Sequence, residues 1–138
     1  MAVEQTLILA KPDAMRRSLA GEIVARFERR GFRLRAARLL AVDRELAQKH
    51  YAEHEAKPFF GELVEFITSG PTLAFVLEGE GAIATARKTI GATDPAEACP
   101  GSLRGQFAVA MPDNLVHGSD SAESAAREIA LWFPDGLV

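Results

Sequence analysis

The sequence predicts an α/β fold in which helices pack on one sheet, and two observations indicate it. Strand-like and helix-like apolar patterns alternate along all 138 residues without a linker or a repeat. Only four segments have strand character, which is too few for a doubly wound parallel sheet. We therefore expect a ferredoxin-like split βαβ sandwich, a four-stranded, mainly antiparallel sheet with helices packed over one face.

The first three predicted elements are a strand, a helix and a second strand. Residues 6–10 are a short apolar run bounded by Lys-Pro-Asp, which is typical of a buried strand. Apolar residues at helical spacing over 19–27 predict a helix that ends at Gly31. Over 32–36 apolar residues alternate with arginines, which indicates a strand with one exposed face. The alternation slips at 36–37, where a bulge would fit.

The middle of the chain predicts two helices and a central strand. Asp43 is a suitable N-cap for a helix that runs to about Tyr51. Apolar residues over 60–67 predict a second helix, closed by the Ser-Gly-Pro sequence at 69–71. Residues 72–77 are apolar on both faces, as expected of a strand inside the sheet.

The last third of the chain predicts a helix, a long loop, a strand and a final helix. The first helix covers 83–90 and ends at Gly91. The loop over 91–105 is rich in glycine and proline, and loops of this length in small domains are often functional. Alternation over 107–111 predicts the last strand, and helical spacing over 122–133 predicts the last helix.

Length and composition limit the function classes. The 138 residues allow one domain with one core, over residues 1–138. The net charge of −3 weighs against general nucleic-acid binding, which usually needs a basic excess. No apolar run approaches the roughly 18 residues of a membrane helix, and the first residues lack a signal peptide's pattern. We expect a cytoplasmic protein with neither a membrane nor a specific nucleic acid as a partner.

The segment from Asn114 to Ser121 is the richest in groups that could react. Asp120, with Glu123 three residues later, resembles a capping box, which would place His117 just before a helix N-terminus. Free N–H groups there favour anions, and a neutral imidazole can attack phosphorus. Spacing alone is also compatible with a simpler outcome, a loop histidine hydrogen-bonded within its own turn.

Three separated cations could converge on one polyphosphate. Lys11 follows the first strand, and strand ends are where α/β sheets place ligand groups. Arg87 lies beside the apolar stripe of its helix. Arg104 lies between Gly101 and Gly105, which allow backbone to approach a ligand closely. The planar guanidinium suits phosphate, although three solvated surface cations remain the plainer alternative.

Metal binding by the protein itself has little support in the sequence. Cys99 is the only cysteine, so an internal disulfide and a cysteine-rich metal site are excluded. His50 and His54 have a spacing that can hold a metal on a helix, but no carboxylate or cysteine completes a zinc pattern. Phe59 could stack on a base or cover a helix start. The chain has neither a P-loop nor a dinucleotide-binding fingerprint.

These residues occur in a familiar order, because the sequence resembles the nucleoside diphosphate kinases over nearly its whole length. The most specific match is NxxHGSDS at 114–121, which is accompanied by KPD at 11–13 and PFF at 58–60. Further matches are GEIVARFE at 21–28, HYAEH at 50–54, TSGP at 68–71, EG at 78–79, GATDP at 91–95, PGSLRG at 100–105 and EIALWF at 128–133.

The resemblance implies a ping-pong phosphoryl transfer through a phosphohistidine. A nucleoside triphosphate would give its γ-phosphoryl group to His117, which would pass it to a different nucleoside diphosphate. Phe59 would stack on the base with Met111 on the other side, and stacking accepts every base. Lys11 and Asn114 would contact the sugar, particularly its 3′-hydroxyl.

The resemblance also implies the groups around the phosphates. The side chains that would hold them are Arg87, Thr93 and Arg104. Tyr51 would lie near the transferred group. Glu128 would orient the imidazole through its other ring nitrogen, with Ser119 in support. Mg²⁺ would be held mainly by the phosphates and water, which agrees with the lack of a protein metal cluster.

Assembly as a homotetramer or a homohexamer is a further implication, with the loop over 91–112 both lining the site and packing between subunits. Longer relatives use a C-terminal extension at subunit contacts, whereas this chain stops at Val138, so both assemblies stay open. The departures from the family pattern are Ala14 for glycine, Ser102-Leu103 for Thr-Ile and Gln106 for aspartate. None has an implied contact with the nucleotide, although Ala14 would be strained if its turn needs a positive φ.

Two alternatives of other classes are less well supported. The first is a module that binds nucleotide or a partner without turnover, and the intact His117, Lys11, Arg87, Arg104, Asn114 and Glu128 argue against it. The second is an RNA-binding ferredoxin-like domain, which needs exposed aromatic residues on adjacent strands and a basic face. A chain that is 7% aromatic with a net charge of −3 offers neither.

Overall fold

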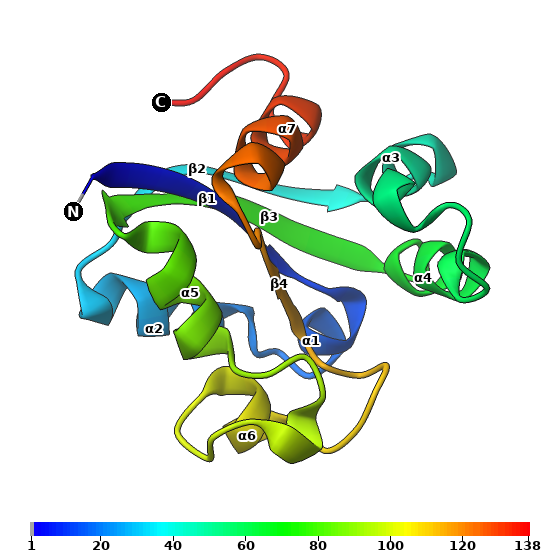
Figure 1. Ribbon diagram of the computed structural model, residues 1–138, viewed down its shortest axis with the longest axis horizontal. Helices are drawn as coiled ribbons and strands as arrows, with labels where there is room; N and C mark the ends of the chain where they lie inside the picture. The colour runs from blue at the N-terminus through cyan, green and yellow to red at the C-terminus, as the bar shows by residue number, and fades with distance from the viewer. Residues whose placement is uncertain (1) are drawn as a thin grey trace.

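Four antiparallel strands form the sheet at the centre of the molecule (Figure 1). The computed structural model describes residues 2–138. The strands are β1 (Val3–Ala10), β2 (Arg33–Ala41), β3 (Pro71–Glu80) and β4 (Val116–Gly118). Their order is β2-β3-β1-β4, and every neighbouring pair is antiparallel. Because β3 separates β1 from β2, this is the split arrangement, and the ferredoxin-like prediction is confirmed.

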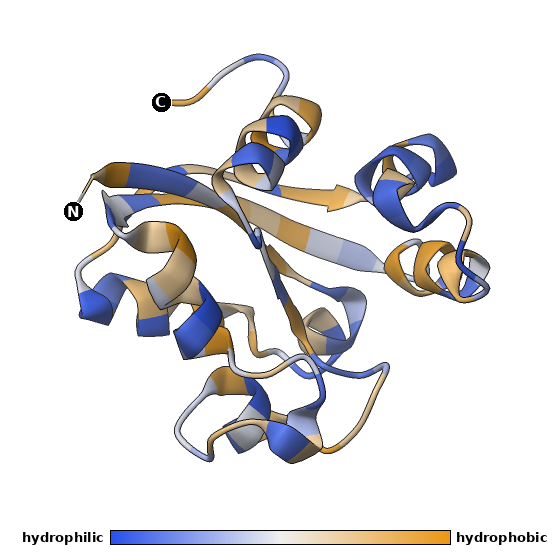
Figure 2. Cartoon of the chain, in the orientation of Figure 1, coloured by the Kyte–Doolittle hydropathy of each residue, from blue (hydrophilic) through white to orange (hydrophobic). Residues whose placement is uncertain are grey.

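In the described part of the chain, seven helices connect and cover these strands. They are α1 (Pro12–Arg16), α2 (Ala20–Arg30), α3 (Arg44–His50), α4 (Phe60–Ile67), α5 (Ala82–Ile90), α6 (Leu103–Phe107) and α7 (Ala122–Trp132). Two single 3₁₀ turns, η1 (Ala52–His54) and η2 (Pro95–Glu97), lie in the connections. Figure 2 shows α4 coloured as hydrophobic over most of its length, whereas the neighbouring α3 is largely hydrophilic.

Helices pack on both faces of the sheet, so the expectation of one covered face was wrong. Figure 1 shows α2 and α5 on one side of the strands and α7 on the other. Ile8 packs with Phe27 of α2 and Ile90 of α5, whereas Leu9 packs with Trp132 of α7. Successive side chains of a strand point to opposite faces, and both sets are apolar in β1, so each face needs its own cover.

The helix boundaries follow local chemistry, with one correction. Gly31 ends α2 in the left-handed conformation (φ 108°), and Asp43 caps α3 by accepting a backbone N–H at 2.8 Å, both as predicted. The cap of α7 is Ser121, whose hydroxyl accepts the N–H of Ser124 at 3.1 Å. The capping box predicted at Asp120 is therefore wrong by one residue.

The last strand lies later in the chain than predicted. Phe107 ends α6, and Val109 and Met111 are 84% and 50% exposed in the loop that follows. The strand is β4, in which His117 pairs with Leu9 of β1. Alternation over three apolar residues is too short to separate a strand from an extended loop. His117 thus has a backbone fixed by the sheet.

Two smaller predictions can also be compared with the structure. The irregularity of β2 lies between Leu34 and Ala36, one residue earlier than the predicted bulge at 36–37. Ala14 is buried inside α1 with helical backbone, so the strain of a positive φ does not arise.

Among residues 2–138, no helix combines the length and the apolar character needed to cross a bilayer.

Gly105 is expected to tolerate no side chain, because a Cβ there would lie 1.9 Å from the carbonyl oxygen of Cys99. Gly105→Ala should lower the free energy of unfolding by about 1–3 kcal/mol, since backbone must move to make room. Gly101→Ala is the matched control, because a Cβ at Gly101 meets nothing within 4 Å. Urea unfolding followed by circular dichroism measures both, and equal midpoints for the two variants would contradict this packing.

Candidate active site

A cleft of about 1310 Å³ lies between the α3–α4 side of the molecule and β4. Its lining includes every site residue predicted from the sequence except Ser119: Lys11, Tyr51, Phe59, Arg87, Thr93, Arg104, Met111, Asn114, His117 and Glu128. Ser119 lies behind the cleft and contacts Glu128. The structure therefore brings the predicted residues together in one place.

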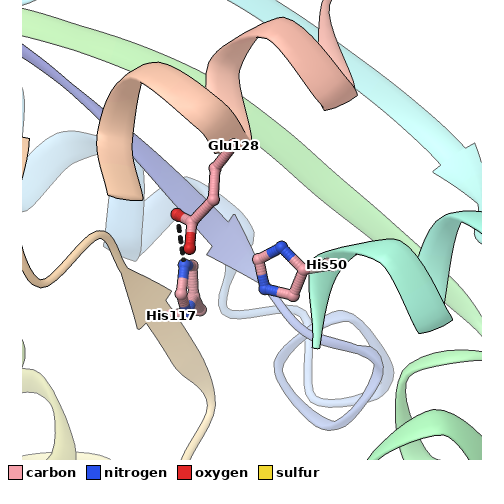
Figure 3. Close-up of side chains that lie close together, drawn as sticks. All are labelled: His50, His117 and Glu128. Carbon is pink, nitrogen blue, oxygen red and sulfur yellow. Dashed lines mark hydrogen bonds and ion pairs between the residues drawn. The ribbon is translucent and has the colours of Figure 1, made fainter. Parts of the chain in front are cut away.

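His117 and Glu128 form the central pair of this cleft. Nε2 of His117 lies 2.9 Å from Oε1 of Glu128, and the hydroxyl of Ser119 donates to the same oxygen at 2.7 Å. Figure 3 shows the His117 ring pointing toward the Glu128 carboxylate. Because a carboxylate can only accept, Nε2 carries the ring proton and Nδ1 keeps the lone pair. The half-buried imidazole thus has one nitrogen oriented by α7 and one free to react.

Glu128 is ionised at neutral pH although it is buried. Burial by itself would raise the pKa of the carboxyl group, but the hydrogen bonds from His117 and Ser119 favour the charged form. The pKa of Glu128 therefore lies below its usual range. A permanent negative charge on α7 fixes both the tautomer and the orientation of the His117 ring.

Lys11 and Asn114 meet at the end of β1. The ammonium group donates to Oδ1 of Asn114, whose Nδ2 donates to the carbonyl oxygen of Thr93 at 3.0 Å. Lys11 is only 8% exposed. Burial, together with the charge of Arg104, lowers its pKa to about 8, against the opposing effect of Asp13. A buried amine beside an amide is a preformed donor for a polar ligand.

Arg104 ties the loops of the cleft together. Its guanidinium donates to the carbonyl oxygens of Asn114, Gly91 and Val116 at 3.1, 3.1 and 2.6 Å. Burial and then the charge of Arg87 lower its pKa to about 10. A guanidinium has five N–H groups, so two remain for a ligand. The sequence predicted an anion-binding role and missed this structural one.

The remaining cleft residues differ in how firmly they are held. Arg87 of α5 donates one hydrogen bond, to the carbonyl oxygen of Gly118 at 3.1 Å. Burial raises the pKa of Tyr51 to about 12, so its hydroxyl stays protonated. Phe59, Met111 and Thr93 are exposed in the cleft. The apolar side chains of Phe59 and Met111 at the opening suit a flat ligand. The cationic Lys11 and Arg104 are buried deeper in the cleft.

Sequence reasoning missed Asp13, although it belongs to the Lys-Pro-Asp segment. Its Oδ2 accepts the backbone N–H of Leu115 at 2.9 Å, and Leu115 has a φ of 70°. A left-handed leucine costs on the order of 1–2 kcal/mol and persists only where the surroundings enforce it. Asp13 thus holds the turn that connects Asn114 to β4. The sequence signal was an acidic residue in the Lys-Pro-Asp segment that follows the first predicted strand.

His50 and His54 do not act as a pair. His50 lies against His117, with ring centroids 4.6 Å apart, whereas the His54 ring lies 5.6 Å from that of Phe59. The two histidines therefore face different parts of the cleft, and the helical metal pair considered from their spacing does not form.

Comparison with known proteins gives one consistent result. The family model described as "Nucleoside diphosphate kinase" matches residues 4–138. Nucleoside diphosphate kinase 1 of Spinacia oleracea is 56% identical over 99% of this chain and 92% of that protein. The nucleoside diphosphate kinase of Rubrobacter xylanophilus is 60% identical over 95% and 98%. The structure of a halophilic nucleoside diphosphate kinase from Halobacterium salinarum in complex with CDP superposes with a TM-score of 0.95, at 46% identity over 99% of this chain and 92% of that chain.

The depressed pKa of Lys11 can be measured directly. In a titration of ¹³Cε-labelled lysine by NMR, Lys11 should change state near pH 8 rather than at its ordinary value of 10.5. Asp113→Asn should lower this pKa further, because the Asp113 carboxylate favours the ammonium form. Asp135→Asn, near the C-terminus, serves as the control. A transition near 10.5 would mean that the amine is solvated.

Proposed function

The chain belongs to the nucleoside diphosphate kinase family, and from that premise we propose how its cleft performs the transfer. The protein is an enzyme that moves a phosphoryl group from a nucleoside triphosphate to a nucleoside diphosphate. The single observation that carries the assignment of roles is the His117–Glu128 pair at the inner wall of a cleft lined by cations.

His117 is the proposed nucleophile. The lone pair of Nδ1 forms a bond to the γ-phosphorus, the bond from that phosphorus to the bridging oxygen breaks, and the nucleoside diphosphate leaves with the electron pair. The ring proton stays on Nε2, where Glu128 at 2.9 Å stabilises the positive charge that the imidazole gains. A second nucleoside diphosphate then takes the phosphoryl group by the reverse of these events, which is a ping-pong reaction.

The phosphates are proposed to lie against Arg87, Thr93 and Arg104. Phosphoryl transfer depends mainly on positioning and on stabilising charge, and a guanidinium offers paired donors for both. The two N–H groups of Arg104 that do not hold backbone are available for this role. The protonated hydroxyl of Tyr51, which lines the same cleft, is the proposed donor near the transferred group.

The nucleoside is proposed to enter between Phe59 and Met111. Both side chains are exposed, 41% and 50%, at the edge of the cleft. Stacking accepts purines and pyrimidines alike, which supports broad base specificity. Lys11 and Asn114 are the proposed contacts of the sugar and its 3′-hydroxyl, because their polar heads meet inside the cleft.

Mg²⁺ is proposed to be held by the phosphates and water rather than by the protein. In the described chain, His50, His117 and Glu128 alone place three ligand atoms within 4.8 Å of one another. This set is rich in imidazole, whereas Mg²⁺ prefers six oxygen ligands. The protein donors therefore do not fit Mg²⁺, and a phosphate-bound ion would supply charge neutralisation.

Self-association as a homotetramer or a homohexamer is also proposed, together with a cytoplasmic location. The support for self-association is apolar surface: Leu39 on the edge strand β2 is 62% exposed, and Val109 in the loop after α6 is 84% exposed. An edge strand also presents unpaired backbone groups, so β2 offers both apolar and hydrogen-bonding surface to another subunit.

Labelling with γ-³²P-ATP in the absence of an acceptor tests the nucleophile. The protein should retain a label that acid removes and base does not, and His117→Ala should reduce it about a thousandfold or more. His54→Ala is the matched control and should retain the label, because His54 lies beside Phe59 and away from Glu128. A label that survives His117→Ala would falsify the assignment.

Substitutions of Arg104 and Arg87 should differ in their effects on the free energy of unfolding. Arg104→Ala should reduce transfer and also lower the free energy of unfolding by at least about 3 kcal/mol, because buried carbonyl groups lose a charged donor. Arg87→Ala should reduce transfer about 10- to 100-fold while costing about 1 kcal/mol or less, since it makes one backbone bond. Steady-state kinetics and urea unfolding measure both. Equal losses of stability would contradict these distinct roles.

A further inference from the structure

His50 is buried directly behind His117 and has no role in the transfer described so far. It ends α3, is 4% exposed, and packs edge-to-face against three aromatic rings. The ring centroids lie 4.6 Å from His117, 4.8 Å from Tyr51 and 5.5 Å from Trp132. Figure 3 shows the ring lying beside the His117–Glu128 pair, and ligand atoms of the three side chains lie within 4.8 Å of one another.

Trp132 determines which nitrogen of His50 carries the proton. The indole Nε1 of this fully buried tryptophan lies 3.0 Å from Nδ1 of His50. An indole nitrogen can only donate, so Nδ1 must be the acceptor and the proton of the neutral ring sits on Nε2. A second proton on His50 would set two N–H groups against each other in a buried space, at the cost of an unsatisfied donor.

The charged groups that face His50 come from every element packed on it. Arg127 and Glu128 lie on α7, Lys11 follows β1, His117 lies on β4, and the phenol of Tyr51 follows α3. Burial is the largest influence and lowers the pKa of His50 to about 3; His117, Arg127 and Lys11 act in the same direction, and Glu128 opposes them. The ring is therefore neutral wherever the enzyme works.

We propose that His50 is a positioning residue for His117: Trp132 keeps it as the neutral Nε2–H tautomer, and its uncharged ring holds the imidazole of His117 without competing with it for Glu128. This inference rests on the proposed role of His117 as nucleophile. The role of His50 is linked to that of His117 by charge, because the His117 ring gains positive character when it takes the phosphoryl group. A charged His50 at this distance would repel that ring and compete for Glu128.

Trp132→Phe tests the proposal, because it keeps an aromatic ring and removes the N–H donor. Without that donor Nδ1 can accept a proton, so the pKa of His50 should rise from about 3, while burial still holds it below its ordinary value of 6.5. The protonated form then grows as the pH falls. The kcat/KM profile of the variant should gain an acid limb that steepens toward about tenfold per pH unit below that pKa, relative to the unmodified enzyme.

The double variant Trp132→Phe with His50→Gln is the matched control. Glutamine does not titrate, so kcat/KM should be lower than that of the unmodified enzyme at every pH but should lack the new acid limb. Loss of packing alone would lower activity without a pH-dependent difference between the two variants. An acid limb that persists in the double variant, or a profile of Trp132→Phe parallel to that of the unmodified enzyme, would overturn the proposal.

NMR of the ring nitrogens of the unmodified enzyme gives a readout that needs neither activity nor a variant that folds. Nδ1 of His50 should be unprotonated and the ring should not titrate above about pH 5, because the pKa is about 3. A proton on Nδ1, or a transition near 6.5, would reject the proposal even if His117 is the nucleophile. Retention of the ³²P label by the His117→Ala variant would instead reject the role of His117 as nucleophile. The measured tautomer of His50 would not be affected by that result.

Discussion

The guanidinium of Arg104 is the contact on which the rest of the site depends. It binds carbonyl oxygens of Gly91, Asn114 and Val116, which belong to the start of a long loop, its end and the first residue of β4. Hydrogen bonds to a buried charge contribute about 1.5–3 kcal/mol each, more than a neutral pair does. One side chain thereby closes the loop that carries Thr93 and Met111 and anchors the strand that carries His117.

The shortness of β4 explains why such an anchor is needed. A three-residue strand has few ladder bonds of its own, and it begins after a left-handed Leu115 that is unfavourable in isolation. Asp13 binds the N–H of that residue from one side, and Arg104 binds its two neighbours' carbonyl groups from the other. The nucleophile is therefore positioned by side-chain contacts on a rigid sheet, which suits a reaction that depends on positioning.

The sequence predicted the fold where patterns were long and failed where they were short. The helices ending at Gly31 and starting after Asp43 have clear periodicity and caps, and both are confirmed. The strand predicted at 107–111 rested on three alternating apolar residues, of which Val109 and Met111 prove to be exposed. For the site, motifs located His117 and the cations. They could not reveal the structural roles of Asp13 and Arg104, because the partner in each hydrogen bond is a backbone N–H or carbonyl group, which almost any residue type can supply.

The cations of the cleft form a cluster of like charges that repel one another. Burial and the neighbouring arginine charges lower the pKa of Lys11 to about 8 and that of Arg104 to about 10, in a chain whose net charge is −3. A polyphosphate bound among them would favour the charged forms and raise both pKa values. The backbone carbonyls and Asn114 already fix these groups in place, so little reorganisation accompanies binding. An acidic protein can thus bind a strongly anionic substrate, because local geometry rather than overall charge sets the field in the cleft.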